Sequence, residues 1–141
     1  MYHKILVPID IDHPVMQGKA VSTACQLAQD YDATLHFLVV VPAVTPLASS
    51  FFPEDHTRKM LEQASQLLHN FTALHVSAEL KIQHIVANGG IYEEILAARE
   101  TIGSDLIVMM SHRPELSDYL LGPNAARVVR HAPCTVMVVR D

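Results

Sequence analysis

The sequence has few of the features that mark secreted, membrane-spanning or nucleic-acid-binding proteins. It contains only two cysteines, Cys25 and Cys134, which is too few for a disulfide scaffold, and they lack metal-ligand spacing. The longest strongly apolar run, Leu35 to Val44, is much shorter than the about 20 residues that a membrane-spanning helix needs. No basic block accompanies the formal charge of −5. We therefore expect neither a nucleic acid nor a membrane as partner.

The N-terminal residues, Met1 to Lys4, lead directly into a hydrophobic strand and do not resemble a signal peptide. Together with the low cysteine count, this predicts a reducing, cytoplasmic location. A length of 141 residues, of which 50% are hydrophobic, predicts a single domain over residues 1–141 with a substantial core.

Recognisable catalytic motifs are also missing. The nine histidines are scattered, without a paired spacing or a carboxylate cluster beside them. The nucleophile elbow Gly-x-Ser-x-Gly and the Walker loop do not occur. The sequence therefore predicts no catalytic residue and no metal-ligating residue. Enzymatic activity stays an open question, with ATP hydrolysis at most slow.

Hydrophobic patterns predict alternating strands and helices. Short apolar runs mark strands, and apolar residues at helical spacing mark helices. Asp12 is a candidate cap for the first helix, with Pro14 in its first turn. The expected strands are 5–9, 34–41, 76–86, 106–110 and 135–139, the expected helices are 13–31, 54–72, 91–102 and about 125–132, and a surface loop is expected at 43–53.

This alternation predicts right-handed β-α-β units and an α/β fold with a parallel sheet covered by helices on both faces. The third strand, 76–86, alternates imperfectly between apolar and polar residues, which favours a position at a sheet edge. The pattern alone leaves the order of the strands open.

Three segments near the C-terminus resemble the signature region of the universal stress protein family. They are Ser111-His112-Arg113-Pro114, Leu120-Leu121-Gly122 and Val129-Arg130-His131-Ala132-Pro133-Cys134. The resemblance covers essentially the whole chain. It implies a single doubly wound five-stranded parallel sheet with the order 3-2-1-4-5 and a switch point between strands one and four. In such sheets, ligands bind outside the carboxyl ends of the strands at the switch point.

The same resemblance implies an adenine-nucleotide site. In the family, a segment like Pro8-Ile9-Asp10 and a position like Val40 meet the adenosine, and a loop cap is the alternative role for Asp10. Gly89 resembles the family's Gly-x-Pro turn, with Ile91 in place of the proline. The phosphate-binding positions are Met109, Met110, Ser111, His112, Arg113, Gly122, Pro123 and Asn124.

The phosphate loop departs from the family pattern of three glycines followed by Ser or Thr. Met110 and Arg113 replace the first two glycines, and Pro123 replaces the hydroxyl residue. Eight residues separate Arg113 from Gly122, a shorter spacing than the usual one. Pro123 lacks a backbone N–H and so removes donors from the site. A branch of the family carries this Ser-His-Arg-Pro form, and Arg113 and Asn124 offer compensating donors.

Two functions therefore remain open. The first is a dimeric stress-response regulator that binds ATP or AMP, with Mg²⁺ held only through the nucleotide phosphates. The second is a nucleotide-independent dimeric stress or interaction protein with a degenerate phosphate loop. In both, the hydrophobic edge strand Thr135–Val139 is expected to form a homodimer, and the further protein partner is unidentified.

Overall fold

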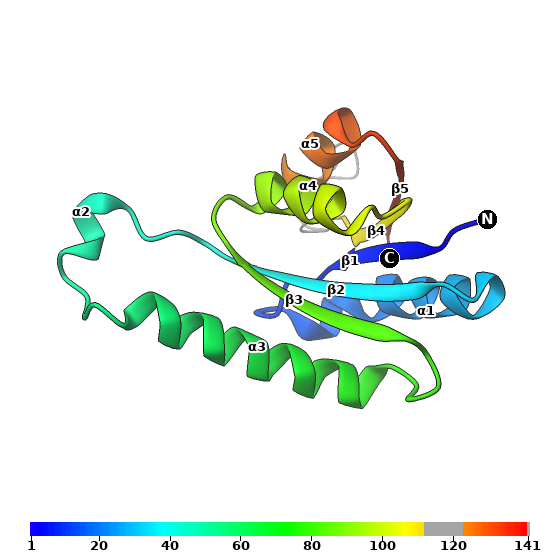
Figure 1. Ribbon diagram of the computed structural model, residues 1–141, viewed down its shortest axis with the longest axis horizontal. Coiled ribbons are helices and arrows are strands. Elements are labelled where there is room, and N and C mark those ends of the chain that lie inside the picture. Colours follow the sequence, from blue (N-terminus) through cyan, green and yellow to red (C-terminus); the bar gives the residue numbers. More distant parts are fainter. Residues whose placement is uncertain (112–122, 141) are drawn as a thin grey trace.

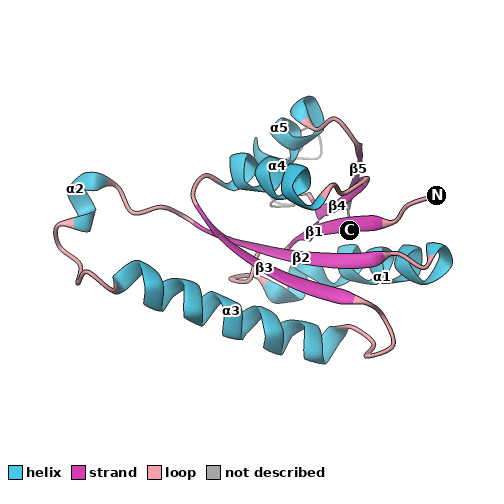
Figure 2. Cartoon of the chain, in the orientation of Figure 1, coloured by secondary structure: helices cyan, strands magenta, loops and turns pink. Residues whose placement is uncertain are grey.

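The chain forms one five-stranded sheet with helices on both faces (Figures 1 and 2). This computed structural model describes residues 1–111 and 123–140. The strands are β1 (Lys4–Pro8), β2 (Thr34–Val41), β3 (Ile82–Asn88), β4 (Leu106–Met110) and β5 (Thr135–Val139). All neighbouring pairs are parallel, in the order β3-β2-β1-β4-β5. The predicted fold class and strand order are confirmed.

The helices divide between the two faces of the sheet (Figure 1). They are the 3-10 helix η1 (Pro14–Gln17) and the α-helices α1 (Gly18–Tyr31), α2 (Pro46–Ser49), α3 (His56–His75), α4 (Ile91–Ile102) and α5 (Pro123–His131). Helices α1 and α3 cover one face, and α4 and α5 cover the other. Between the last two, the Arg127 guanidinium lies 5.0 Å from the centre of the Tyr92 ring.

Alternate residues of the central strands point to opposite faces of the sheet, where each face has its own hydrophobic core. In β1, Ile5 and Val7 pack on the side of α1 and α3, whereas Leu6 packs on the side of α4 and α5. All three side chains are fully buried. This explains why the central strands read as continuous apolar runs, since a parallel sheet covered on both faces needs no polar alternation.

The predicted first helix, 13–31, is wrong in its first turn. The segment begins as η1, and α1 starts only at Gly18. Asp12 does not cap it, because His13 is the capping residue of η1 and has no side-chain capping hydrogen bond. Instead, the Asp12 backbone N–H donates to the Asp10 carboxylate at 3.1 Å, which holds this segment as a loop.

The segment predicted as a loop at 43–53 contains a short helix, α2, which projects beyond the sheet (Figure 1). Its first turn is capped by Thr45, whose hydroxyl accepts a hydrogen bond from Ala48 N at 3.2 Å. Pro46 follows the cap, a position where the missing N–H is tolerated. The capping hydrogen bond and Pro46 therefore favour one helical turn inside this proline-containing segment. Its Leu47 is 79% exposed.

The predicted third strand, 76–86, is displaced. Helix α3 continues three residues beyond its predicted end, to His75, and Val76 N still donates to Thr72 O at 2.9 Å. A turn then places Leu80 N 3.2 Å from Ser77 O, so pairing with β2 begins only at Ile82. The prediction that this strand is a sheet edge is confirmed, because β3 pairs with β2 alone among the described strands.

Candidate functional site at the carboxyl ends of the strands

A cavity of about 420 Å³ opens at the carboxyl ends of β1, β2 and β4. It lies where the chain order reverses between β1 and β4, which is the switch point at which doubly wound sheets bind ligands. Its apolar part comes from strand ends and from the start of α4. The lining consists of Pro8, Ile9, Asp10, Ile11, Asp12, His13, Met16, Gln17, Leu38, Val39, Val40, Pro42, Ile91, Ile95, Met109, Met110, Ser111, Asn124 and Ala125.

The loop after β1 supplies the charged groups of this lining. The Asp10 carboxylate accepts a hydrogen bond from Asp12 N at 3.1 Å through Oδ1, and its Oδ2 lies 3.0 Å from His13 Nδ1. His13 N donates to the Asp10 carbonyl at 3.1 Å. Asp10 therefore performs the loop-capping role, and it also lines the cavity. One face of its carboxylate fixes the backbone that presents Asp12 and His13.

The end of β4 and the start of α5 form the opposite wall. Ser111 N donates to Val139 O at 2.9 Å, which continues the pairing with β5 up to the cavity. Ser111, Asn124 and Ala125 all line the cavity, so the first turn of α5 faces it. A helix N-terminus carries a partial positive charge that favours anions. Pro123 is the first residue of α5 and has no N–H to offer there.

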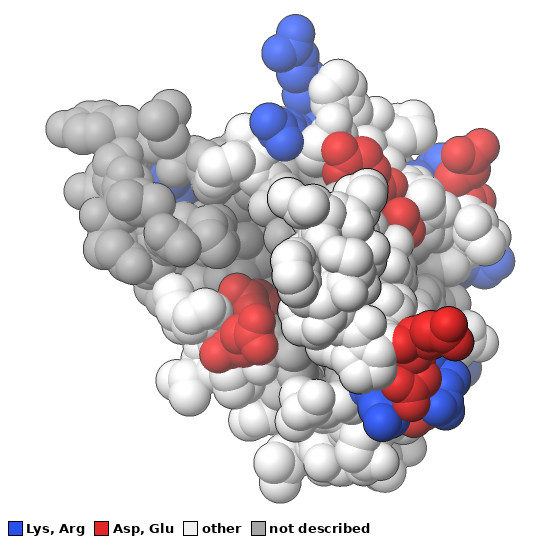
Figure 3. All heavy atoms as spheres, turned by 90° about the vertical axis from the view of Figure 1, so that its left-hand side faces the viewer, with Lys and Arg blue, Asp and Glu red and all other residues white. Residues whose placement is uncertain are grey.

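The charge of the cavity is acidic in the part that the structure describes. Asp10 and Asp12 bring carboxylates, and none of the described lining residues is Lys or Arg. Figure 3 views the molecule from the side on which α2 projects, and the described surface there is mostly uncharged, with small groups of both acidic and basic side chains. Among the described lining residues, the donors available to an anionic ligand are backbone N–H groups, the Ser111 hydroxyl, the Asn124 amide and the His13 ring.

The structure brings most of the predicted site residues together. Eight of them line the cavity: Pro8, Ile9, Asp10, Val40, Met109, Met110, Ser111 and Asn124. Three others, His112, Arg113 and Gly122, lie outside the described residues.

Two predicted residues are placed beside the cavity and not in its lining. Gly89 forms the turn between β3 and α4, with φ of 154° and its N–H donating to Val41 O at 3.0 Å. The positive φ favours glycine at this turn, because side chains rarely adopt that backbone conformation, whereas the nearby Glu94 carboxylate could move to make room for a Cβ. Pro123 starts α5, and its neighbour Asn124 provides the lining.

Sequence reasoning missed the contributions of His13, Gln17 and Ile91 to the cavity. His13 and Gln17 belong to a segment that the periodicity assigned to a regular helix, whereas the structure makes it a loop and a 3-10 turn. From the sequence alone, Ile91 was considered only as the residue that replaces the proline of the family's Gly-x-Pro turn. A usable signal was present, because the segment following a parallel strand at the switch point faces the ligand side of the sheet.

The groups with shifted pKa values lie away from this cavity. Burial raises the pKa of the Cys25 and Cys134 thiols, so neither cysteine has the character of a reactive thiolate. Burial lowers the pKa of His36, and the nearby positive charge of Lys4 lowers it further. Within residues 1–111 and 123–140, no group of three or more His, Cys, Asp or Glu side chains could hold a metal ion.

No helix in the described part of the chain is both long and apolar enough to cross a membrane. The longest helix, α3, mixes buried residues with many charged and polar ones along its outer face.

Comparisons with known proteins agree with this fold. A solved structure of a hypothetical protein whose biochemical function was assigned from its structure has a TM-score of 0.81 at 24% identity, covering 100% of this chain and 97% of that one. The crystal structure of a universal stress protein in complex with cAMP has a TM-score of 0.62 at 21% identity, covering 99% of this chain and 97% of that one. Both likenesses concern the fold.

Sequence comparison goes further than the fold. The chain is 34% identical to universal stress protein G of Shigella flexneri over 99% of this chain and 100% of the relative. The family model described as "Universal stress protein family" matches residues 1–140. With the sheet order, the switch-point cavity and this match over nearly the full length, the chain belongs to the universal stress protein family.

Proposed function

We propose that the protein is a dimeric stress-response regulator that binds an adenine nucleotide, ATP or AMP, in the switch-point cavity. The observation that carries the proposal is the cavity itself, which combines an apolar interior with polar groups at the β1 loop, Ser111 and Asn124. A volume of about 420 Å³ lies within the range of small-molecule sites. A family member of the same fold was solved in complex with cAMP, an adenine nucleotide, which supports the choice of ligand.

The apolar residues suit a planar base, and the polar groups suit a ribose and phosphate. Val40 on β2 and Ile95 on α4 both line the cavity and offer apolar surface for van der Waals contact with a ring. Ser111, Asn124 and the α5 N-terminus lie together on the other wall. A Mg²⁺ ion would enter with the nucleotide and be held by phosphate oxygens and water, because both Asp10 oxygens already have protein partners.

Calorimetric titration with AMP and with ATP–Mg²⁺ at millimolar concentration tests the proposal directly. We expect saturable binding to the wild-type protein. Ile91, which is 42% exposed at the cavity, can be enlarged to block the space with little effect on the core. Ile91→Trp is expected to weaken binding at least about tenfold, equivalent to about 1.4 kcal/mol. Leu47→Trp is the matched control, since Leu47 is 79% exposed on α2 and does not line the cavity.

Absence of binding by the wild type would reject the nucleotide proposal and favour the second candidate, a nucleotide-independent dimeric interaction protein. One observation supports that alternative. The described lining carries two carboxylates and no Lys or Arg, and Pro123 removes an N–H from the first turn of α5. Such a site should bind an anion more weakly than a helix N-terminus that keeps all its N–H donors.

The proposed dimer uses the exposed edge of β5. This strand pairs only with β4 in the described sheet, and an unpaired hydrophobic edge invites pairing with a second copy. Val138→Lys is expected to give a monomer in light scattering at micromolar concentration. Ile85→Lys on the β3 edge is the control, because Ile85 and Val138 are both half-buried against the same core cluster. Dissociation by both variants, or by neither, would contradict the interface. A cytoplasmic location stays a prediction.

A further inference from the structure

His13 stands at the cavity in a position that the local backbone holds firmly. Its N–H donates to the Asp10 carbonyl at 3.1 Å, and its own carbonyl accepts a hydrogen bond from Gln17 Nε2 at 3.3 Å. Gln17 is only 5% exposed, so this second contact comes from a buried side chain. The backbone of His13 is thereby anchored on both sides, while its side chain is 60% exposed.

The imidazole ring is oriented by Asp10. His13 Nδ1 lies 3.0 Å from Asp10 Oδ2, and a carboxylate only accepts hydrogen bonds, so the proton on Nδ1 is fixed by this contact. The other ring nitrogen, Nε2, has no hydrogen-bond partner among the described residues. In the neutral ring Nε2 is an acceptor, and in the protonated ring it is a donor with a positive charge nearby.

The described residues around His13 in the cavity lining are acidic or uncharged. Among the described lining residues, the charged side chains are Asp10 and Asp12, both from the loop of His13 itself. The facing elements contribute uncharged groups: Gln17 from η1, Ser111 after β4 and Asn124 from α5. Among the described lining residues, His13 is therefore the one side chain that can carry a positive charge toward an anionic ligand.

Resting on the proposed nucleotide site, we infer that His13 is a ligand-binding residue that takes up a proton when a phosphorylated nucleoside binds. Asp10 is its positioning residue, because its carboxylate accepts a hydrogen bond from Nδ1 and so orients the ring. The protonated Nε2 donates a hydrogen bond to the ligand phosphate and offsets the repulsion from Asp12. An uncharged nucleoside needs no such proton, because a hydroxyl can donate to neutral Nε2.

Proton uptake makes the affinity for phosphorylated nucleosides depend on pH. Imidazoles change charge between about pH 5 and pH 8, so binding of an anion should strengthen as pH falls through this range. The sign follows from linkage, since a complex that holds more protons than the free protein is favoured at low pH. The affinity for an uncharged nucleoside should stay nearly constant over the same range.

Calorimetry with cAMP and adenosine separates these cases. The cyclic phosphodiester keeps a single negative charge over this pH range, so the ligand itself does not titrate, and adenosine is the uncharged comparison. For the wild type, we expect cAMP affinity to rise at least about threefold from pH 8 to pH 6, within the limit of tenfold per pH unit for one proton. Titration at pH 7 in two buffers of different ionisation enthalpy should show net proton uptake with cAMP and none with adenosine.

Variants assign the effect to His13. His13→Gln keeps a hydrogen-bonding side chain without a titratable ring, and should abolish both the pH dependence and the proton uptake. Asp10→Asn should reduce the proton uptake, because the amide stabilises an imidazolium less than a carboxylate does. His3→Gln is the matched control, since His3 is exposed and is not a lining residue of the cavity. It should behave as the wild type.

The outcomes distinguish this inference from the proposed function. Binding of adenosine and cAMP with the same flat pH profile would overturn the role of His13 and leave the nucleotide site intact. A pH dependence that persists in His13→Gln would also overturn it, because the proton would then enter elsewhere. Failure of both ligands to bind the wild type at millimolar concentration would reject the nucleotide site itself, and the inference with it.

Discussion

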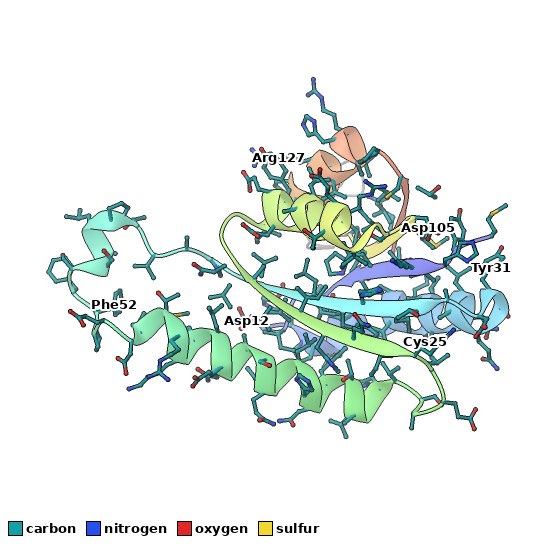
Figure 4. All side chains as sticks on the ribbon, in the orientation of Figure 1. Asp12, Cys25, Tyr31, Phe52, Asp105 and Arg127 are labelled. Carbon is teal, nitrogen blue, oxygen red and sulfur yellow. The ribbon has the colours of Figure 1, made fainter. Side chains whose placement is uncertain are left out.

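The two ends of the sheet use similar polar side chains for different purposes. At the amino end, the Asp105 carboxylate accepts hydrogen bonds from His3 N at 2.9 Å and Lys4 N at 3.2 Å. The Lys4 ammonium donates to Ile102 O at 3.1 Å, closing the end of α4 over the strand. At the carboxyl end, Asp10 holds its loop in a comparable way, but the loop borders the open cavity. Figure 4 shows Asp12 and Asp105 toward opposite ends of the strands.

The two ends of the sheet differ in whether their polar side chains have all their hydrogen-bond partners among the described residues. Polar atoms at the amino end mostly satisfy backbone groups, and this closes the structure. At the carboxyl end, His13 lines the cavity, and its Nε2 has no partner in the described part of the chain. Hydrogen-bonding capacity that remains open beside a cavity is available to a ligand, whereas the same capacity inside a core only destabilises.

The largest expected effect comes from exchanging the two aspartates for alanine. Asp105→Ala leaves the N–H groups of His3 and Lys4 without their carboxylate partner, and each hydrogen bond to a charged group contributes about 1.5 to 3 kcal/mol. We expect the free energy of unfolding to fall by about 3 kcal/mol, with nucleotide affinity unchanged. Asp10→Ala should lower it by only about 1 kcal/mol, because its loop is more exposed, but should weaken nucleotide binding.

Urea unfolding and calorimetric titration of both variants measure the two quantities. Asp105→Asn is the control, because the amide oxygen retains one acceptor for the strand and should restore part of the lost stability. Equal losses of stability in Asp10→Ala and Asp105→Ala, without a difference in ligand affinity, would remove the functional distinction between the two ends.

The sequence predicts most of the sheet because the central strands are buried on both faces. Strands 34–41, 106–110 and 135–139 and helix 91–102 have the predicted bounds. Gly103, expected to end that helix, has φ of 74°, the left-handed conformation that glycine adopts without strain. Errors fall where local hydrogen bonds decide the structure. The predicted first turn of the first helix is part of the loop held by Asp10. The third strand begins later than predicted, after a longer α3 and a turn.

The site was predictable where it lies on strand ends. The family resemblance named Asp10, Val40 and Ser111, and the rule that ligands bind at the carboxyl ends of a doubly wound sheet selects the same strand ends. The role of His13 could not be predicted, because it depends on a side-chain contact with Asp10 that exists only in the folded loop. The predicted phosphate residues His112, Arg113 and Gly122 lie outside the described residues, so their contribution stays a prediction.

A buried histidine in the amino-end half of the sheet gives the next test. His36 is 5% exposed, lies opposite Leu6 in the sheet register, and has no hydrogen-bond partner for either ring nitrogen among the described residues. Burial lowers its pKa, so the folded protein keeps it neutral at a pH where the unfolded chain takes up a proton. Stability should therefore fall as pH drops below about 6.5, the ordinary value for the unfolded chain.

His36→Leu should raise the free energy of unfolding by about 2 kcal/mol at pH 5.5. About 1 kcal/mol reflects removal of an unpaired polar group, and about 1.4 kcal/mol per pH unit is the limit for one proton. Urea unfolding at pH 7.5 and pH 5.5 measures both contributions. His84 should retain a smaller acid sensitivity in the variant, since burial and His69 also lower its pKa. A gain that does not grow on acidification would contradict this account of His36.

The smallest expected effect concerns Pro123, where the carboxyl end lacks a donor that a helix start normally supplies. Pro123→Ser restores a backbone N–H and adds a hydroxyl at the first residue of α5, beside Asn124 in the cavity lining. One added hydrogen bond contributes about 1 kcal/mol, so affinity for AMP should rise about fivefold. Pro123→Ala restores the N–H alone and separates the backbone contribution from that of the hydroxyl. Titration of AMP against all three proteins gives the answer: tighter binding in both variants identifies the N–H as limiting, tighter binding in the serine variant alone identifies the hydroxyl, and unchanged affinity in both would show that other donors already serve the phosphate.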